Sequence, residues 1–304
     1  MRVIVLLAQH VGGVRVGSVA RFSRIVAVGD VHGDLRALRA CLRVAGVVDR
    51  DGGWATDHAL VVSTGDVLDG GGEDWKCLKY LRSLQETARR QGGDVVLTLG
   101  NHECLNLQGN LASVAPQGFL DVESDVGSRR AAFLPGGPGA LLLNDLCAGS
   151  PVARIVGDTL FCHGGVHVDF LDRHRPEAAS YREVLSSVNA KACDWLVGRR
   201  VDTLADGTPR ILDFRSPAWL RLYSNPPNAE PSKRHCDAAR HALRALGCNR
   251  MVVGHTPQFS ADSCCGDRVY RIDTGAHYGG PKEALELRKG LEPRVRSAAI
   301  RSNL

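Results

Sequence analysis

The stretch Leu99-Gly100-Asn101-His102-Glu103 decides the fold of this chain. It follows an apolar run at residues 94–98, which has the composition of a buried strand, and it precedes residues 104–107, which are suited to begin a helix. Gly100 allows the backbone to bend tightly between the two elements. The turn therefore presents an amide, an imidazole and a carboxylate at the carboxyl end of a strand, where sites form in open α/β sheets.

The same order of strand, polar loop and helix occurs twice more before this stretch. Residues 24–28 lead into Gly29-Asp30-Val31-His32-Gly33 and a helical pattern that ends at Gly46. Residues 59–63 lead into Gly65-Asp66-Val67-Leu68-Asp69 and a helical pattern over residues 73–90. These repeats predict parallel strands joined by right-handed crossovers. One edge of the sheet would then carry the side chains of Asp30, His32, Asp66, Asp69, Asn101 and His102.

Two later strands also end at residue types that bind metals. A predicted hairpin at residues 154–162 leads into His163, and a predicted strand at residues 250–253 leads into Gly254-His255. A single histidine after a strand is weak evidence, but five such strand exits are hard to explain by chance. Imidazole, carboxylate and amide oxygen suit manganese, iron or zinc, whereas an all-oxygen site would suggest magnesium or calcium. Two such ions about 3.5–4 Å apart are suited to hydrolysing a phosphate monoester.

The motifs resemble those of the phosphoprotein phosphatase family of calcineurin-like metallophosphoesterases, which carry Gly-Asp-x-His-Gly, Gly-Asp-x-x-Asp-Arg-Gly, Gly-Asn-His-Glu, His-Gly and Gly-His. The matches extend from residue 29 to residue 255. Residues 45–49, 217–221, 250–258 and 271–275 are more specifically similar to the Shewanella-like, or bacterial-type, protein phosphatases. The resemblance implies an α/β fold, a four-layer α/β/β/α sandwich with a dimetal site at the strand carboxyl ends.

The resemblance also implies a role for each motif residue. The metal ligands would be Asp30 and His32 for the first ion, Asp66 as the bridge, and Asn101, His163 and His255 for the second ion. His102 would protonate the leaving oxygen, and Asp69 would orient the His102 imidazole. Arg221 would bind the substrate phosphate. The cofactors implied are two divalent metal ions, manganese first, with iron or zinc as alternatives.

One position departs from the family pattern. The family has an arginine directly after the carboxylate matched by Asp69, and this chain has Gly70. An arginine binds phosphate through two parallel hydrogen bonds, which glycine does not provide. Arg221 would then act alone, or a neighbour such as Lys76 would take the arginine's place.

Three functional hypotheses follow. The first is a dimetal-dependent phosphatase acting on phosphorylated protein side chains, phosphotyrosine as well as phosphoserine. The second is a diadenosine-tetraphosphate hydrolase or another small-molecule phosphohydrolase. The third is a pseudophosphatase weakened by Gly70, against which the intact pair of Asp69 and His102 argues, because a non-catalytic site has no need of an acid.

The composition is that of a globular protein of 304 residues, with 44% hydrophobic and 23% charged residues. No apolar run approaches the roughly 20 residues of a membrane helix, and the net charge of +5 is spread without a nucleic-acid motif. We therefore expect a phosphorylated protein or small phosphoester as partner, with no nucleic acid and no membrane; a regulatory subunit is not indicated either way.

The predicted catalytic domain covers residues 24–288. Residues 1–23 are basic and form an N-terminal extension, either a targeting segment or a first strand, and residues 289–304 form a basic, partly disordered tail. The expected location is intracellular, in the cytoplasm or in an organelle if the extension is a transit peptide. Ten cysteines are spread without a Cys-x-x-Cys pair, so most are expected to be buried thiols, and a bond from Cys264-Cys265 to another thiol is not expected.

Overall fold

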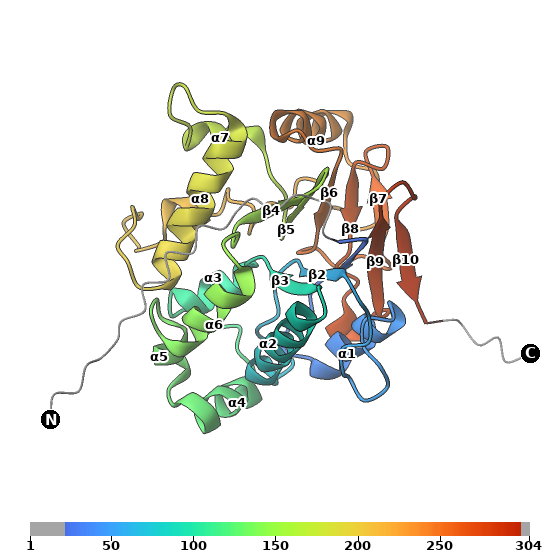
Figure 1. Ribbon diagram of the computed structural model, residues 1–304. Coiled ribbons are helices and arrows are strands. Elements are labelled where there is room, and N and C mark those ends of the chain that lie inside the picture. The colour runs from blue at the N-terminus through green and yellow to red at the C-terminus, as the bar shows by residue number, and fades with distance from the viewer. Residues whose placement is uncertain (1–21, 299–304) are drawn as a thin grey trace, which may run out of the picture.

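Two five-stranded sheets form the centre of the protein in the computed structural model, which describes residues 22–298 (Figure 1). The first sheet has the order β10-β9-β1-β2-β3. Its strands are β1 (Arg24–Val28), β2 (Ala59–Ser63), β3 (Asp94–Leu97), β9 (Glu283–Arg288) and β10 (Arg294–Ser297). β1, β2 and β3 are parallel, and β9 and β10 extend this sheet in antiparallel pairing.

The second sheet has the order β4-β5-β6-β8-β7. Its strands are β4 (Ala153–Val156), β5 (Thr159–Cys162), β6 (Arg250–Val253), β7 (Asp262–Cys264) and β8 (Val269–Arg271). β5, β6 and β8 are parallel, whereas the edge strands β4 and β7 pair antiparallel. The predicted hairpin of β4 and β5 is therefore confirmed.

The two sheets pack face to face. One hydrophobic cluster joins inward residues of both sheets, namely Ala27, Leu60, Val62 and Val96 from the first and Phe161, Val252 and Tyr270 from the second. Val26 and Val28 belong to a different cluster, because successive strand residues point to opposite sides of a sheet. The layer between the sheets is thus a hydrophobic core, and the ends of the strands lie at its edge.

Helices cover the outer face of each sheet. The first sheet is flanked by α1 (Leu35–Val44), α2 (Asp74–Arg90) and α6 (Pro138–Cys147), with α3 (Asn101–Leu107), α4 (Pro116–Val126) and α5 (Arg129–Phe133) beside them. The second is flanked by α7 (Val168–Arg173), α8 (Tyr181–Leu196) and α9 (Lys233–Leu246), as Figure 1 shows. Short 3-10 helices are η2 (Arg210–Leu212) and η3 (Ala276–Tyr278). The predicted α/β/β/α arrangement is confirmed.

Several elements differ from the prediction. β10 lies inside the segment predicted to be a basic tail, where it pairs with β9. The sequence pattern predicts a helix from Cys236 to Leu246. α9 begins earlier, at Lys233, because the Ser232 hydroxyl accepts a hydrogen bond from His235 N at 3.3 Å and caps the helix. The N-terminal extension lies almost entirely outside the described residues. No helix within residues 22–298 is long and apolar enough to cross a membrane.

The cysteine prediction needs one correction. Cys265 forms a disulfide with Cys236, which joins the turn between β7 and β8 to α9. Sequence spacing does not reveal such a pair, because the two residues are 29 positions apart and belong to different elements. Buried free thiols make up most of the remainder, as expected: Cys41, Cys77, Cys104, Cys147, Cys162, Cys248 and Cys264.

Candidate active site

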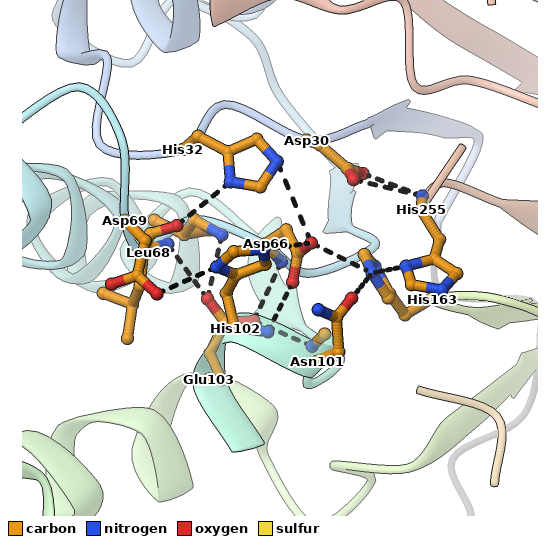
Figure 2. Close-up of polar contacts among 12 residues, drawn as sticks. Asp30, His32, Asp66, Leu68, Asp69, Asn101, His102, Glu103, His163 and His255 are labelled. Carbon is orange, nitrogen blue, oxygen red and sulfur yellow. Dashed lines mark hydrogen bonds and ion pairs between the residues drawn. The ribbon is translucent and has the colours of Figure 1, made fainter. Parts of the chain in front are cut away.

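The predicted site residues gather at the carboxyl ends of five strands (Figure 2). They follow β1, β2, β3, β5 and β6 as Asp30, His32, Asp66, Asp69, Asn101, His102, His163 and His255. All of them are buried except His102, which is partly exposed. The first sheet supplies one part of this group and the second sheet the other, so the site lies where the two sheets meet.

Asp66 is the centre of the group. Its Oδ2 atom lies 3.2 Å from His163 Nε2, 3.8 Å from His32 Nε2 and 3.9 Å from His102 Nε2. Burial opposes the charge of Asp66, but His163 and His102 outweigh burial and hold the pKa of Asp66 well below its usual range. A carboxylate that remains charged between two sets of imidazoles is suited to bridge two cations.

Backbone carbonyls orient three of the imidazoles. His32 Nδ1 lies 3.2 Å from Leu68 O, and His163 Nδ1 lies 2.9 Å from Thr64 O. His255 uses its other nitrogen, Nε2, which lies 3.1 Å from Trp219 O. Because a carbonyl only accepts, each of these nitrogens carries the proton, and the opposite nitrogen keeps a lone pair toward the centre of the site. Metal-bound histidines show this arrangement.

Donor atoms crowd around His163 Nε2. His255 Nδ1 lies 3.0 Å from it, and Asn101 Oδ1 lies 3.1 Å from it. Ligand atoms held about 2.1 Å from one ion are roughly 3 Å apart, so these separations match a shared ion. Burial disfavours a charge on His163, yet Asp66 raises the pKa of His163, while burial and His163 lower the pKa of His255 to about 2. Asp66 therefore favours positive charge on His163, whereas His255 stays neutral with a lone pair available, and the donor set fits a metal ion.

Asp30 lies beside the same group. Its carboxylate accepts a hydrogen bond from His255 N at 3.1 Å (Figure 2). Burial, and then the charge of Asp273, raise the pKa of Asp30 well above its usual range, and burial raises the pKa of Asp273 to about 6. A cation would relieve this crowding of carboxylates. The ligand atoms of His32, Asp66 and His102 all lie within 4.8 Å of one another, and Asp30 does not belong to that set. The assignment of Asp30 to the first ion therefore stays a prediction.

Glu103 organises the loop that carries Asp66. Its carboxylate accepts from the backbone nitrogens of Asp66 at 2.8 Å, Val67 at 2.9 Å and Leu68 at 3.0 Å, and also from Gly100 N at 2.7 Å. Glu103 belongs to the sequence motif at residues 99–103, but the sequence alone assigned it no role. The contacts show that it ties the exit of β2 to the exit of β3.

The backbone is strained where the site residues lie. His32, Asp66, Asp69 and His255 have φ values of 44°, 49°, 70° and 70°, in the left-handed region that side chains rarely adopt. Such conformations cost on the order of 1–2 kcal/mol each and persist where the surroundings enforce them. A Cβ atom on Gly100 would collide with Asp66, which explains why this motif position needs glycine.

His102 and Asp69 form the expected pair. His102 Nδ1 lies 2.8 Å from Asp69 Oδ2 (Figure 2). Burial opposes a charged imidazole, but the hydrogen bond to Asp69 and the charge of Asp66 raise the pKa of His102 to about 9. Asp69 therefore holds the His102 ring in place and favours its protonated form, and the role of His102 as the proton donor stays a prediction.

Arg129 is the residue that the sequence did not reveal. Its side chain is 0% exposed, and it donates to Asp69 Oδ1 at 2.9 Å and to Asp74 Oδ2 at 2.6 Å. It also donates to Asn106 Oδ1 at 3.0 Å, and the Asn106 amide in turn donates to Asp69 at 3.0 Å. α5 lies in residues 109–150, where hydrophobic periodicity is weak, and a single arginine there gave no signal.

The predicted phosphate-binding residues have mixed outcomes. Arg221 is exposed and lies beside the site, because its Nη1 donates to His255 O and to Thr256 Oγ1. Lys76 does not replace the missing arginine: its Nζ atom lies 3.2 Å from Glu73 Oε1, and its side chain is 55% exposed on α2. Gly70 has a φ of 96°, which disfavours arginine at this position.

This chain shares sequence with known proteins. A family model described as calcineurin-like phosphoesterase matches residues 23–259. Shewanella-like protein phosphatase 2 of Arabidopsis thaliana is 29% identical, over 90% of this chain and 77% of the relative. Shewanella-like protein phosphatase 1 of Plasmodium berghei is 27% identical, over 85% of this chain and 69% of the relative.

The solved structures show the same fold. The cold-active protein-tyrosine phosphatase of a psychrophilic Shewanella species superposes with a TM-score of 0.71 at 23% identity, over 91% of this chain and 81% of that one. A protein serine/threonine phosphatase from Saccharomyces cerevisiae superposes with a TM-score of 0.59 at 15% identity, over 93% of this chain and 82% of that one.

Proposed function

Because the chain belongs to the calcineurin-like phosphoesterases, we propose that it is a dimetal-dependent protein phosphatase that hydrolyses phosphate monoesters. The family uses a dimetal centre, and the Asp66 group supplies donors of the right kind on both sides of one carboxylate. Asp30 and His32 would hold the first ion, Asp66 would bridge, and the second ion would be held by Asn101, His163 and His255. Imidazole, carboxylate and amide donors favour manganese, iron or zinc.

The contact that carries the proposal is the pair of His102 and Asp69, 2.8 Å apart beside Asp66. When bound, two divalent ions would supply positive charge to the phosphoryl oxygens and lower the pKa of a water molecule. His102 would then give its proton to the leaving oxygen, with Asp69 and Arg129 keeping the imidazole oriented. Arg221 would bind the phosphate from the side of His255. A protein that only binds phosphate has no need of an oriented acid.

Phosphorylated proteins are the proposed substrates. Both named relatives are protein phosphatases, and they support this class over diadenosine tetraphosphate. The structural neighbours include a tyrosine phosphatase and a serine/threonine phosphatase, so phosphotyrosine and phosphoserine peptides both belong in the assay.

The test compares p-nitrophenyl phosphate, the two kinds of phosphopeptide and diadenosine tetraphosphate with manganese-loaded protein. We expect turnover of the monoesters and its loss after chelation, and we expect His102→Asn to lose activity while keeping its metal. Preferential cleavage of diadenosine tetraphosphate would favour the small-molecule hypothesis. Absence of all turnover in a protein that holds two ions would favour the pseudophosphatase.

A further inference from the structure

Gly70 leaves room that another residue occupies. A Cβ atom placed on Gly70 would lie 3.0 Å from His277 Nε2, 3.3 Å from His277 Cδ2 and 3.4 Å from His32 Cβ. His277 is 207 positions further along the chain, on η3, and reaches the site from the loop that follows β8. An imidazole therefore borders the space where a side chain at position 70 would begin.

The loop that carries His277 is held firmly. Lys282 Nζ donates to Ala276 O at 2.8 Å and to Gly280 O at 2.9 Å. The Thr274 hydroxyl donates to Pro281 O at 2.7 Å, and Gly275 N donates to Asp273 Oδ1 at 2.9 Å. These bonds close the loop upon itself at both ends, so they fix the backbone from which the His277 side chain extends.

The two nitrogens of His277 face different surroundings. Nδ1 lies 3.9 Å from Asp34 Oδ2, while Nε2 faces Gly70 and has no hydrogen-bond partner among residues 22–298. The side chain is only 19% exposed. Nε2 of His277 is therefore free to form a hydrogen bond with a ligand bound beside Gly70.

The ring also borders the first-ion side of the site. Its centroid lies 6.2 Å from that of His32, and the rings of His32 and His102 are 4.8 Å apart. The Tyr278 ring, 71% exposed, lies 4.8 Å from His277 and 6.0 Å from His32. Four rings thus extend from the acid His102 to the molecular surface along the edge that Gly70 leaves open.

We propose that His277 is a substrate-binding residue that donates a hydrogen bond from Nε2 to the substrate phosphate, in place of the arginine that Gly70 lacks. This inference rests on the proposed function, because it assumes that a phosphate ester binds at the Asp66 group. One imidazole makes one hydrogen bond where an arginine makes two. His277 and Arg221 would then hold the phosphate from opposite sides.

The test measures phosphate binding as well as turnover. Manganese-loaded wild type, His277→Ala and His277→Gln are titrated with inorganic phosphate by calorimetry and assayed with p-nitrophenyl phosphate. A hydrogen bond to a charged group is worth about a tenfold change in affinity or more. We expect His277→Ala to weaken phosphate binding and raise KM by about that factor, with kcat changed less than threefold.

Two variants separate binding from packing. Glutamine places an N–H close to the position of the imidazole Nε2, so His277→Gln should recover most of the phosphate affinity. His241→Ala, an exposed histidine on α9, is the matched control and should leave both constants unchanged. Phosphate affinity within twofold of wild type in His277→Ala, or equal losses in the alanine and glutamine variants, would overturn the inference.

The same data distinguish this inference from the proposed function. If the loaded wild type binds phosphate but cleaves no ester, and His277→Ala loses that binding, the proposed function fails and the inference stands. If the wild type cleaves esters and His277→Ala binds phosphate normally, the proposed function stands and the inference about His277 fails. Gly70→Arg alone should be destabilised by the 96° φ and by the 3.0 Å approach to His277, and adding His277→Ala should remove the second of these costs.

Discussion

Replacing Arg129 with methionine tests how the proton donor is held. The guanidinium is fully buried between Asp69 and Asp74, which are themselves almost inaccessible. Breaking a buried ion pair by removing one partner typically costs about 3–5 kcal/mol, because a charge is left without compensation. We therefore expect Arg129→Met to lower the free energy of unfolding by about that amount at pH 7.5, measured by urea unfolding.

Asp74 provides the matched variant. Burial raises the pKa of Asp74 to about 6 even with Arg129 present, above the ordinary value of 3.8. Because the pKa of Asp74 is higher in the folded protein than in the unfolded chain, the folded state binds the proton more tightly. The free energy of unfolding therefore falls by about 3 kcal/mol as the pH rises from about 4 to about 6. Asp74→Asn removes this dependence and keeps an oxygen to accept from Asp69 N. In the Arg129→Met/Asp74→Asn double variant, much of the lost stability should return.

Catalysis gives an independent measure of the same contact. If Arg129 keeps Asp69 in position for His102, Arg129→Met should slow alkyl phosphates more than p-nitrophenyl phosphate, whose leaving group needs less protonation. A merely structural arginine would slow both substrates equally. The reasoning is refuted if the free energy of unfolding of Arg129→Met lies within about 1 kcal/mol of the wild-type value and the variant keeps the wild-type ratio of the rates for alkyl phosphate and p-nitrophenyl phosphate.

Three further predictions follow from the site and the disulfide. Asp66→Asn and His255→Ala should each lose the second ion together with activity; full metal content in both purified variants would show that the ligand assignment is wrong. His102→Asn should keep both ions and lose about two to four orders of magnitude in turnover, less for p-nitrophenyl phosphate than for an alkyl phosphate; equal losses would argue against His102 as the acid. Reducing the bond between Cys236 and Cys265, which are 29 positions apart, should lower the free energy of unfolding by roughly 3–4 kcal/mol; an unchanged urea midpoint after complete reduction would contradict this.

The strand exits were predictable because their chemistry is local. A buried β-branched run, a glycine and a ligand-type side chain lie within a few residues of each other, as in Gly29-Asp30 and Gly254-His255. Parallel strands place such exits at one edge, so the pattern predicts which side chains meet. The structure brings together the whole predicted set, although the role of each residue stays a prediction.

The residues that support this set were not predictable in the same way. Arg129 acts on Asp69 across 60 positions, and His277 approaches Gly70 across 207 positions. Neither residue lies in a motif. Arg129 lies in residues 109–150, where the hydrophobic periodicity is weak, and His277 lies in the loop after the short strand β8, so only the packing of the folded chain places them. The pairing of Cys236 with Cys265 has the same cause, because only the fold brings α9 to the β7–β8 turn.

The two-sheet arrangement explains why the site has this form. Asp66 comes from the first sheet, while His163 and His255 come from the second, and their ligand atoms meet only because both sheets share one core. The left-handed backbone at Asp66 and His255 is unfavourable in isolation, and the four hydrogen bonds to Glu103 together with that core offset it. Ions that bind only the folded donor set would stabilise the fold further by mass action. Sheet packing, backbone strain and metal binding are therefore parts of one equilibrium. A substitution that loosens the contact between the two sheets would weaken metal binding even if it replaced none of the metal ligands.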